Sequence, residues 1–298
     1  MVLKSKHKFY MRICLEVILS PWLYFQNYMK WYFGDSKRRI IKNLVRVPVV
    51  GNELAVCVHE WGGFEGKRIK KIKNIEEFEC GLDYQLERFQ NYKGKYELDL
   101  TVTLSDVHML KNEVKNVKII EVANIGMDFS GYSSFYDTIR DKRNQYVILT
   151  NSSVNKISID FIDDYLDFFK SDESIGMLGI SFSSKMYQTL IRNNFNPHLQ
   201  SFFLLTTTEV LNEIVLKNKG FPGKGINHKL ELIRNGEIKL SRLVLDLGYK
   251  LVCVLEDGTP HYFDKNNFKD NGRNSWGSFF GDYRLVLKNP NAISTLKV

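Results

Sequence analysis

Residues 121–154 constrain the fold more than any other part of the chain. They read as a β-prone segment, an Asn-Ile-Gly-Met-Asp turn, a helix over residues 128–142, and a second strand at 146–149 that runs into Thr150-Asn151-Ser152-Ser153. This order predicts a parallel β-α-β unit, because parallel strands need a long crossover connection. Ligands of such sheets bind beyond the carboxyl ends of the strands. The polar residues that follow both strands are therefore where we first expect a site.

The same alternation extends from residue 55 to residue 181. Helix-period patterns at 76–90, 128–142 and 161–169 separate β-prone runs, and a further helix at 208–217, a helical segment at 228–248 and a strand at 250–255 follow. The β-prone runs lie at 55–59, 98–104, 117–122, 146–149 and 175–181. This pattern predicts an α/β fold with a mostly parallel sheet and helices on both faces. With 298 residues, 44% of them apolar, the chain is long enough for one large core.

Positive charge is concentrated at the start of the chain. Residues 1–46 contain ten Lys or Arg and only two acids, so they account for the formal net charge of +8 of the whole chain. The remaining residues are electrically balanced. Nucleic-acid binding would instead predict basic residues over one face of the body. We therefore predict no nucleic-acid partner.

The first 46 residues also hold a cluster of aromatic side chains. Arg12, Glu16, Pro21, Gln26 and Lys30 interrupt the apolar run, so it fits neither a signal peptide nor a spanning helix. Aromatic rings flanked by cations suit a bilayer interface. We predict a helical membrane-surface extension at 1–46, a linker around 44–54 and a single domain at 52–298. The alternative is an extension that packs its aromatic side chains on the body or on a second subunit.

The cysteines point to a reducing compartment. Cys14, Cys57, Cys80 and Cys253 form no C-x-x-C pair and no metal-type spacing. Together with the interfacial extension, this predicts a cytoplasmic protein on the inner face of a membrane.

Two segments resemble a known family, and a third is similar to one group of bacterial enzymes. The stretch "EVANIGMDFSGYSSFYDTIRDKRNQYVILTNSSV" resembles the part of GT-A-type, family 2-like glycosyltransferases that leads to their Asp-x-Asp metal motif. The stretch "NGEIKLSRLVLDLGY" resembles the later segment that carries the catalytic base of inverting members. The run "NPHLQSFFLL", together with "NIGMD", is similar to the bacterial polysaccharide enzymes called rhamnan synthesis protein F. The resemblance covers roughly residues 55–255.

The resemblance implies a GT-A-like, Rossmann-type fold and transfer of a sugar from a nucleotide-diphosphate sugar, of UDP or dTDP type. We predict a role in the synthesis of a surface polysaccharide such as O-antigen or capsule, with a lipid-linked saccharide as acceptor, which would explain the basic aromatic extension on an otherwise neutral body. Glu237 falls at the position of the base, and Leu240, Ser241, Gly248 and Tyr249 keep the flanking pattern. The predicted donor-binding residues are Asn124, Gly126, Asp128, Asp106, Asn151, Ser152 and Ser153, and the predicted acceptor-binding residues are His198, Gln200 and Ser201.

The resemblance also implies Mg²⁺ or Mn²⁺, but this chain has Asn151, Ser152 and Ser153 where the family has its metal-binding acids. Amide and hydroxyl oxygens replace carboxylates poorly around these ions. Metal use therefore stays open, with Ser153 and His261 as candidate ligands. Without a metal, the helix start after Gly126, or a cation among Lys239, Arg242 and Arg273, would have to meet the charge of the diphosphate.

Other interpretations remain at this stage. Glu237 is compatible with a solvated carboxylate at a helix start, and Asp128 with a helix N-cap. At the level of function, the alternatives are a non-catalytic peripheral membrane or nucleic-acid-binding protein and a catalytically inactive GT-A relative. A retaining reaction is a further alternative to the inverting one.

Overall fold

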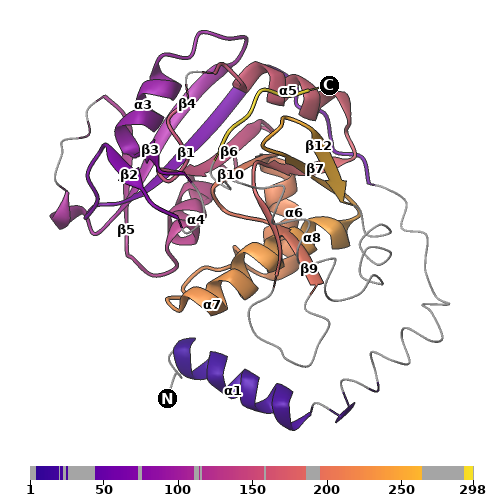
Figure 1. Ribbon diagram of the computed structural model, residues 1–298. Helices are drawn as coiled ribbons and strands as arrows, with labels where there is room; N and C mark the ends of the chain where they lie inside the picture. The colour runs from indigo at the N-terminus through magenta and orange to yellow at the C-terminus, as the bar shows by residue number, and fades with distance from the viewer. Residues whose placement is uncertain are drawn as a thin grey trace.

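The computed structural model describes residues 5–19, 21–22, 25, 44–72, 76–110, 114, 116–157, 159–185, 195–263 and 292–297. Its centre is an eight-stranded sheet in the order β12-β11-β7-β10-β6-β1-β4-β5 (Figure 1). The strands are β1 (Glu53–Trp61), β4 (Glu97–Ser105), β5 (Lys118–Val122), β6 (Tyr146–Asn151), β7 (Ile175–Gly179), β10 (Phe203–Thr207), β11 (Lys250–Val254) and β12 (Pro260–Phe263).

The sheet is mostly parallel, as the sequence predicts. β1 pairs in parallel with both β4 and β6, β4 pairs in parallel with β5, and β11 pairs in parallel with β7. β10 runs antiparallel between β6 and β7, and β12 runs antiparallel beside β11. The predicted α/β fold with a mostly parallel sheet is confirmed, with two antiparallel strands that the sequence pattern does not reveal.

Helices cover both faces of the sheet, and each face has its own apolar core. Residues of α4 (Asp128–Ile139), α6 (Thr208–Asn218) and α8 (Lys239–Leu247) pack on one face, and residues of α3 (Leu82–Gln90) and α5 (Ile162–Ser171) pack on the other (Figure 1). The strands are therefore apolar on both sides, which is typical of buried parallel strands.

The alternation of side chains along β1 decides which of its residues face α4. Ala55 and Cys57 belong to the apolar core on the side of the sheet that α4 covers. Val56 and Val58 belong to the core on the other side, which α3 covers. Since side chains alternate along a strand, His59 continues the α4 side. By the same alternation on β6, Val147 and Leu149 face α4 and Asn151 continues their line. The two strands thus bring polar side chains to the same end of the same face.

The predicted helical segment around Glu237 is interrupted by a wider turn. α7 (Lys229–Leu232) leads into a π-helical turn, η2 (Ile233–Ile238), which continues as α8. Single π-helical turns within helices occur frequently at functional sites. Glu237 lies in this turn.

Several short elements differ from the sequence-based prediction. The predicted helix over 76–90 begins only at Leu82, because Phe78–Cys80 forms strand β3, which pairs with β2 (Arg68–Lys70). Strand β9 (Phe195–Leu199) pairs with β8 (Phe182–Lys185), and a short 3₁₀ turn, η1 (Val107–Met109), follows β4. Elements of three or four residues carry too few positions for a periodic pattern to identify them.

The first helix, α1 (Ser5–Ile18), contacts α7, and the rings of Tyr10 and His228 lie 6.2 Å apart (Figure 1). Among the described residues, no helix has both the length and the apolar character needed to cross a membrane. Large apolar side chains of α1 and the residues just after it are nonetheless solvent-exposed; they are Tyr10, Met11, Leu15, Val17, Ile18, Leu19, Trp22 and Phe25.

The segment predicted as a linker is attached to the body. Arg46 is buried, donates a hydrogen bond to the carbonyl oxygen of Phe169 at 2.5 Å, and lies over the Phe169 ring at 3.9 Å. Leu44 N donates to Gly248 O at 3.0 Å. One of the ten basic residues of the predicted extension is therefore a structural residue of the domain.

Candidate functional site

The order of the strands identifies one edge of the sheet as the place for a site. From β1 the chain continues to β4 and β5 on one side and then returns to β6 on the other side of β1. Neighbouring parallel strands whose connections leave in opposite directions form a crevice at their carboxyl ends, where ligands of open α/β sheets bind. Here these ends are Trp61 of β1 and Asn151 of β6.

A cavity of about 260 Å³ lies at this position. Its walls come from the ends of three neighbouring strands and from the turn that begins α4. The lining residues are His59, Glu60, Trp61, Phe64, Ser105, Asn124, Met127, Asp128, Asn151, Ser152 and Ser153. Five of the seven predicted donor-binding residues are among them.

The turn before α4 has an unusual backbone that directs Asp128 into this region. Gly126 has φ 108°, and Met127 has φ 47° and ψ −130°. A positive φ at a non-glycine residue is strained, and such residues cluster at functional sites. The N-cap position of α4 is Met127 and Asp128 is the first residue of the helix, so the interpretation of Asp128 as the N-cap is wrong. Its Oδ2 instead accepts hydrogen bonds from Asn151 Nδ2 at 2.7 Å and Ser201 Oγ at 3.0 Å.

Glu237 belongs to the same network. Its Oε1 accepts hydrogen bonds from Ser201 Oγ at 3.0 Å and Ser201 N at 3.2 Å. The Glu237 side chain is only 12% exposed, so the interpretation as a solvated carboxylate is wrong. Burial raises the pKa of Glu237 to about 7; the negative charge of Asp128 raises it further, while the hydrogen bonds from Ser201 oppose the shift.

The hydroxyl of Ser201 lies between the two carboxylates and can donate to only one of them at a time. It has one proton, yet it lies 3.0 Å from a carboxylate oxygen of Asp128 and 3.0 Å from one of Glu237. When both carboxylates are ionised, only one of these contacts can be a hydrogen bond. A proton on Glu237 Oε1 satisfies both, because Glu237 then donates to Ser201 Oγ, which donates to Asp128.

The predicted acceptor residues divide into two groups. His198 is buried, and its Nε2 lies 3.8 Å from Glu237 Oε2, so His198 and Ser201 both flank Glu237. Gln200 points elsewhere, since its Oε1 accepts a hydrogen bond from Ser181 Oγ at 2.5 Å. The structure thus joins His198 and Ser201 with the predicted donor residues Asp128 and Asn151.

A second small network lies at the end of β4. Asp106 adopts a left-handed conformation with φ 52°, and its Oδ2 accepts from Trp61 Nε1 at 2.7 Å and Asn124 Nδ2 at 2.8 Å. These hydrogen bonds lower the pKa of Asp106. Two predicted donor residues, Asp106 and Asn124, are therefore in direct contact beside the indole of Trp61.

Asn151, Ser152 and Ser153, the residues at the position of the metal-binding acids in the resembling glycosyltransferases, do not fit a divalent cation. Asn151 Oδ1 already accepts from Ser153 N at 2.9 Å, and Asn151 Nδ2 donates to Asp128. Ser152 Oγ accepts from the cationic Arg68 at 2.7 Å, and a cation here would repel a metal ion. Within the described ranges, no group of three or more His, Cys, Asp or Glu side chains could hold a metal.

The other candidate ligands and cations lie elsewhere. His261 is on β12, the far edge strand, and β11, β7 and β10 separate it from β6. Lys239 and Arg242 are exposed on α8 and do not line the cavity. Arg273 lies outside the described residues.

The sequence analysis did not predict three polar residues at or beside the cavity, which are His59, Glu60 and Arg68. His59 is buried, its Nδ1 lies 3.0 Å from Thr103 Oγ1, and burial lowers its pKa. Glu60 is buried and pairs with Arg68 at 2.8 Å. The only sequence signal was that His59 and Glu60 end a predicted strand, the position expected for ligand contacts.

Gly131 allows α4 to approach this end of the sheet. A Cβ atom at this position would lie 2.3 Å from His59 Nδ1 and 2.4 Å from Thr103 Oγ1. We expect Gly131→Ala to destabilise the protein by about 1–3 kcal/mol, because both contacts involve buried, packed side chains. Urea unfolding measures this, with the exposed Thr138→Ala on the same helix as the control. Equal stability of the two variants would show that α4 does not lie this close to β1 and β4.

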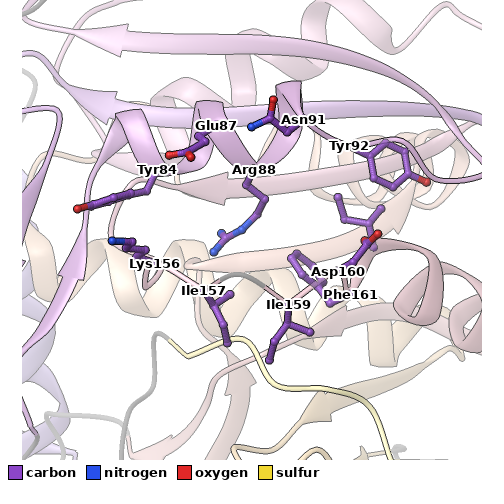
Figure 2. A pocket seen from close by; sticks show the side chains of 11 residues that line it. Tyr84, Glu87, Arg88, Asn91, Tyr92, Lys156, Ile157, Ile159, Asp160 and Phe161 are labelled. Carbon is purple, nitrogen blue, oxygen red and sulfur yellow. The ribbon is translucent and has the colours of Figure 1, made fainter.

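A larger cavity, of about 520 Å³, lies beside α3 and contains none of the predicted residues. Figure 2 shows Arg88 reaching from α3 into its middle. Arg88 donates to Gln85 Oε1 at 2.5 Å and to the carbonyl oxygen of Asn155 at 2.7 Å, and burial lowers its pKa to about 10. These bonds tie α3 to the segment after β6, which is a structural role. The smaller cavity is therefore the candidate site.

Comparisons with known proteins add little to this geometry. No protein-family model matches the sequence, and no curated protein matches it. The 2-C-methyl-D-erythritol 4-phosphate cytidylyltransferase of Francisella tularensis is similar in structure, with a TM-score of 0.36, 18% identity, and coverage of 56% of this chain and 79% of that one. The bifunctional IspDF of Campylobacter jejuni is also similar in structure, with a TM-score of 0.34 and 16% identity. The match covers 67% of this chain and 48% of IspDF, so this chain spans about half the length of that protein. Because both TM-scores are low, neither similarity bears on activity.

Proposed function

We propose that this protein is a GT-A-type glycosyltransferase that uses a UDP- or dTDP-sugar. The observation that carries the proposal is Glu237, a carboxylate with a pKa raised to about 7 by burial, which is linked through Ser201 to Asp128 in the cavity wall. A general base works best when its pKa lies near the working pH. The resemblance to rhamnan synthesis protein F-type enzymes supports the same assignment and suggests a surface polysaccharide as product.

The proposed reaction inverts the anomeric carbon. Glu237 takes the proton of an acceptor hydroxyl, whose oxygen forms a bond to the anomeric carbon. The bond from that carbon to the diphosphate oxygen breaks, and its electron pair leaves with the nucleoside diphosphate. Asp128, Asn151 and Ser201 hold Glu237 and the donor side of the cavity in position, and His198 flanks the acceptor side. No step is assigned to a metal, because the residues do not fit one.

Release of nucleoside diphosphate tests the proposal. We would incubate the full chain with UDP-, dTDP- and GDP-sugars and with short lipid-linked saccharides, and follow the free diphosphate. One donor class should give acceptor-dependent release. Absence of release from every donor would favour the inactive GT-A relative, for which the missing carboxylates at residues 151–153 are the specific observation.

A lipid-linked acceptor would place the protein on the cytoplasmic face of a membrane. The exposed apolar side chains of α1, next to basic residues in the sequence, suit an interface with anionic lipid. We expect the double variant Leu15→Asp and Ile18→Asp to lose most binding to vesicles that contain phosphatidylglycerol. The matched control is Leu216→Asp, at a residue that is 82% exposed on α6. Equal sedimentation of the two variants with vesicles would contradict a membrane role for α1.

A further inference from the structure

Strand β2 presents two positive charges on one face. Side chains two residues apart in a strand point the same way, so Arg68 and Lys70 share a face. Ile69 between them points to the other side and is 63% exposed. Arg68 Nη2 donates to Ser152 Oγ at 2.7 Å, so this face of β2 is turned toward the residues that follow β6.

Arg68 is held firmly in place. Its Nη1 lies 2.8 Å from Glu60 Oε2 and 3.3 Å from the carbonyl oxygen of Glu65. Its guanidinium lies over the ring of Phe64, with the central carbon 4.2 Å from the ring centroid. Glu60, Phe64 and Ser152 all line the candidate cavity, so Arg68 is fixed directly behind its wall. A guanidinium that is already oriented loses little entropy when it binds an anion.

Lys70 adds a charge that no carboxylate among the described residues neutralises by direct contact. In the described part of the chain it has no ion-pair partner, and its Nζ lies 5.2 Å from the centroid of the Phe202 ring. The carbonyl oxygen of Phe202 in turn accepts from Asn151 N at 3.2 Å. Burial and the nearby charges of Arg68 and Lys229 lower the pKa of Lys70, while Asp128 opposes the shift. An arriving anion would relieve the repulsion between these cations.

Arg68 contacts a residue at the position where the resembling enzymes have their metal-binding acids. Ser152 stands where the related family has metal-binding acids, and its hydroxyl contacts Arg68. We propose that Arg68 and Lys70 bind the diphosphate of the nucleotide donor and perform the charge stabilisation that a divalent cation supplies in metal-dependent relatives. This inference rests on the proposed transferase function and names the residues that receive the leaving group.

The role of Arg68 and Lys70 in the reaction follows from the negative charge that develops on the leaving diphosphate. When the bond between the anomeric carbon and the diphosphate oxygen breaks, the electron pair moves onto that oxygen and the diphosphate gains negative charge. Cations fixed beside this oxygen stabilise the charge without reorganisation of solvent. Arg68 offers parallel N–H donors suited to phosphate oxygens, and Lys70 acts as a point charge.

Calorimetric titration of the full chain in EDTA tests this, with inorganic pyrophosphate, UDP and dTDP as probes. We expect Lys70→Gln and Arg68→Lys each to weaken pyrophosphate binding by about 10- to 100-fold, since each removes or distorts a charge-assisted hydrogen bond. The matched control is Lys71→Gln, one residue beyond β2, where the side chain is 75% exposed and pairs with Glu77. This control should bind as the wild type does. Arg68→Lys keeps a charge beside the buried Glu60, and circular dichroism checks that each variant is folded.

The outcomes separate the two proposals. If a nucleotide binds and the Lys70 and Arg68 variants bind it as tightly as the control, the cation site is overturned and the transferase remains. Nucleotide binding that EDTA abolishes and Mn²⁺ restores also overturns the cation site. If pyrophosphate binding depends on both residues but neither nucleotide binds, the cation site stands and the proposed use of a UDP- or dTDP-sugar fails.

Discussion

Glu237→Gln is expected to lower the rate of sugar transfer by about 100- to 10,000-fold, the usual contribution of a general base. The amide has nearly the same shape and its oxygen can still accept from Ser201, so the fold should be retained. What is lost is the ability to take a proton from the acceptor hydroxyl. The measurement is the initial rate of acceptor-dependent release of nucleoside diphosphate.

The pH dependence of the wild-type rate gives an independent check. The base must be ionised, and the pKa of Glu237 is about 7 in the folded protein, so the rate should rise with pH through about 7. Glu231→Gln serves as the control, because Glu231 is also buried and lies six residues earlier in the same helical segment. An active Glu237→Gln protein, or equal losses in the two variants, would remove Glu237 from the role of base.

The second large effect concerns stability. In the unfolded chain Glu237 loses its proton near pH 4.5, whereas in the folded protein it keeps the proton until about pH 7. Between these values the folded state binds more protons than the unfolded state, so the free energy of unfolding falls as pH rises. The loss amounts to at most about 3 kcal/mol by pH 8. Glu237→Gln has no carboxyl group to ionise at this position, so it does not suffer this loss of stability.

We therefore expect Glu237→Gln to be more stable than the wild type at pH 8 and to lose this advantage at pH 4.5. Urea unfolding at the two pH values measures the difference. The control Glu87→Gln, at an exposed position on α3, gives the general effect of losing one negative charge. A Glu237→Gln protein whose stability differs from the wild type equally at both pH values would show that Glu237 is not held in its protonated form by burial.

These two results would also separate catalysis from stability. A carboxylate that destabilises the folded protein above its pKa has no structural benefit at that pH, so a functional reason is needed for its presence. If Glu237→Gln proves more stable and inactive, the carboxylate is retained for chemistry. If it proves more stable and fully active, the raised pKa is only a consequence of packing.

Much of the sheet could be predicted because its parallel strands are regular. The β-α-β-α alternation over residues 55–181 gave the fold class, and the polar residues after the strands gave the edge at which the cavity lies. The position of β10 could not be predicted in this way. Its residues are buried on both faces, like those of its parallel neighbours, so the periodicity does not distinguish its antiparallel direction. That direction brings Ser201 to the carboxyl end of β6.

The candidate site could be predicted as a set of residues but not as a hydrogen-bond network. Asp128, Asn151, Ser201 and Glu237 were each identified by a local motif, whereas their hydrogen bonds join four separate elements. Arg68 was missed, because a three-residue strand within a generally basic stretch gives no pattern that distinguishes one cation from the next. Arg68 became visible only through its contact with Ser152.

The most direct test of the central claim is a calorimetric titration of the full chain with UDP, dTDP and GDP, with variants that fill each cavity. Ser153→Trp fills the cavity at the ends of β1 and β6, and Ile159→Trp fills the larger cavity beside α3. We expect UDP or dTDP to bind with one-to-one stoichiometry, Ser153→Trp to abolish this binding, and Ile159→Trp to leave it unchanged. Absence of binding by all three nucleotides, or binding that only Ile159→Trp abolishes, would contradict it.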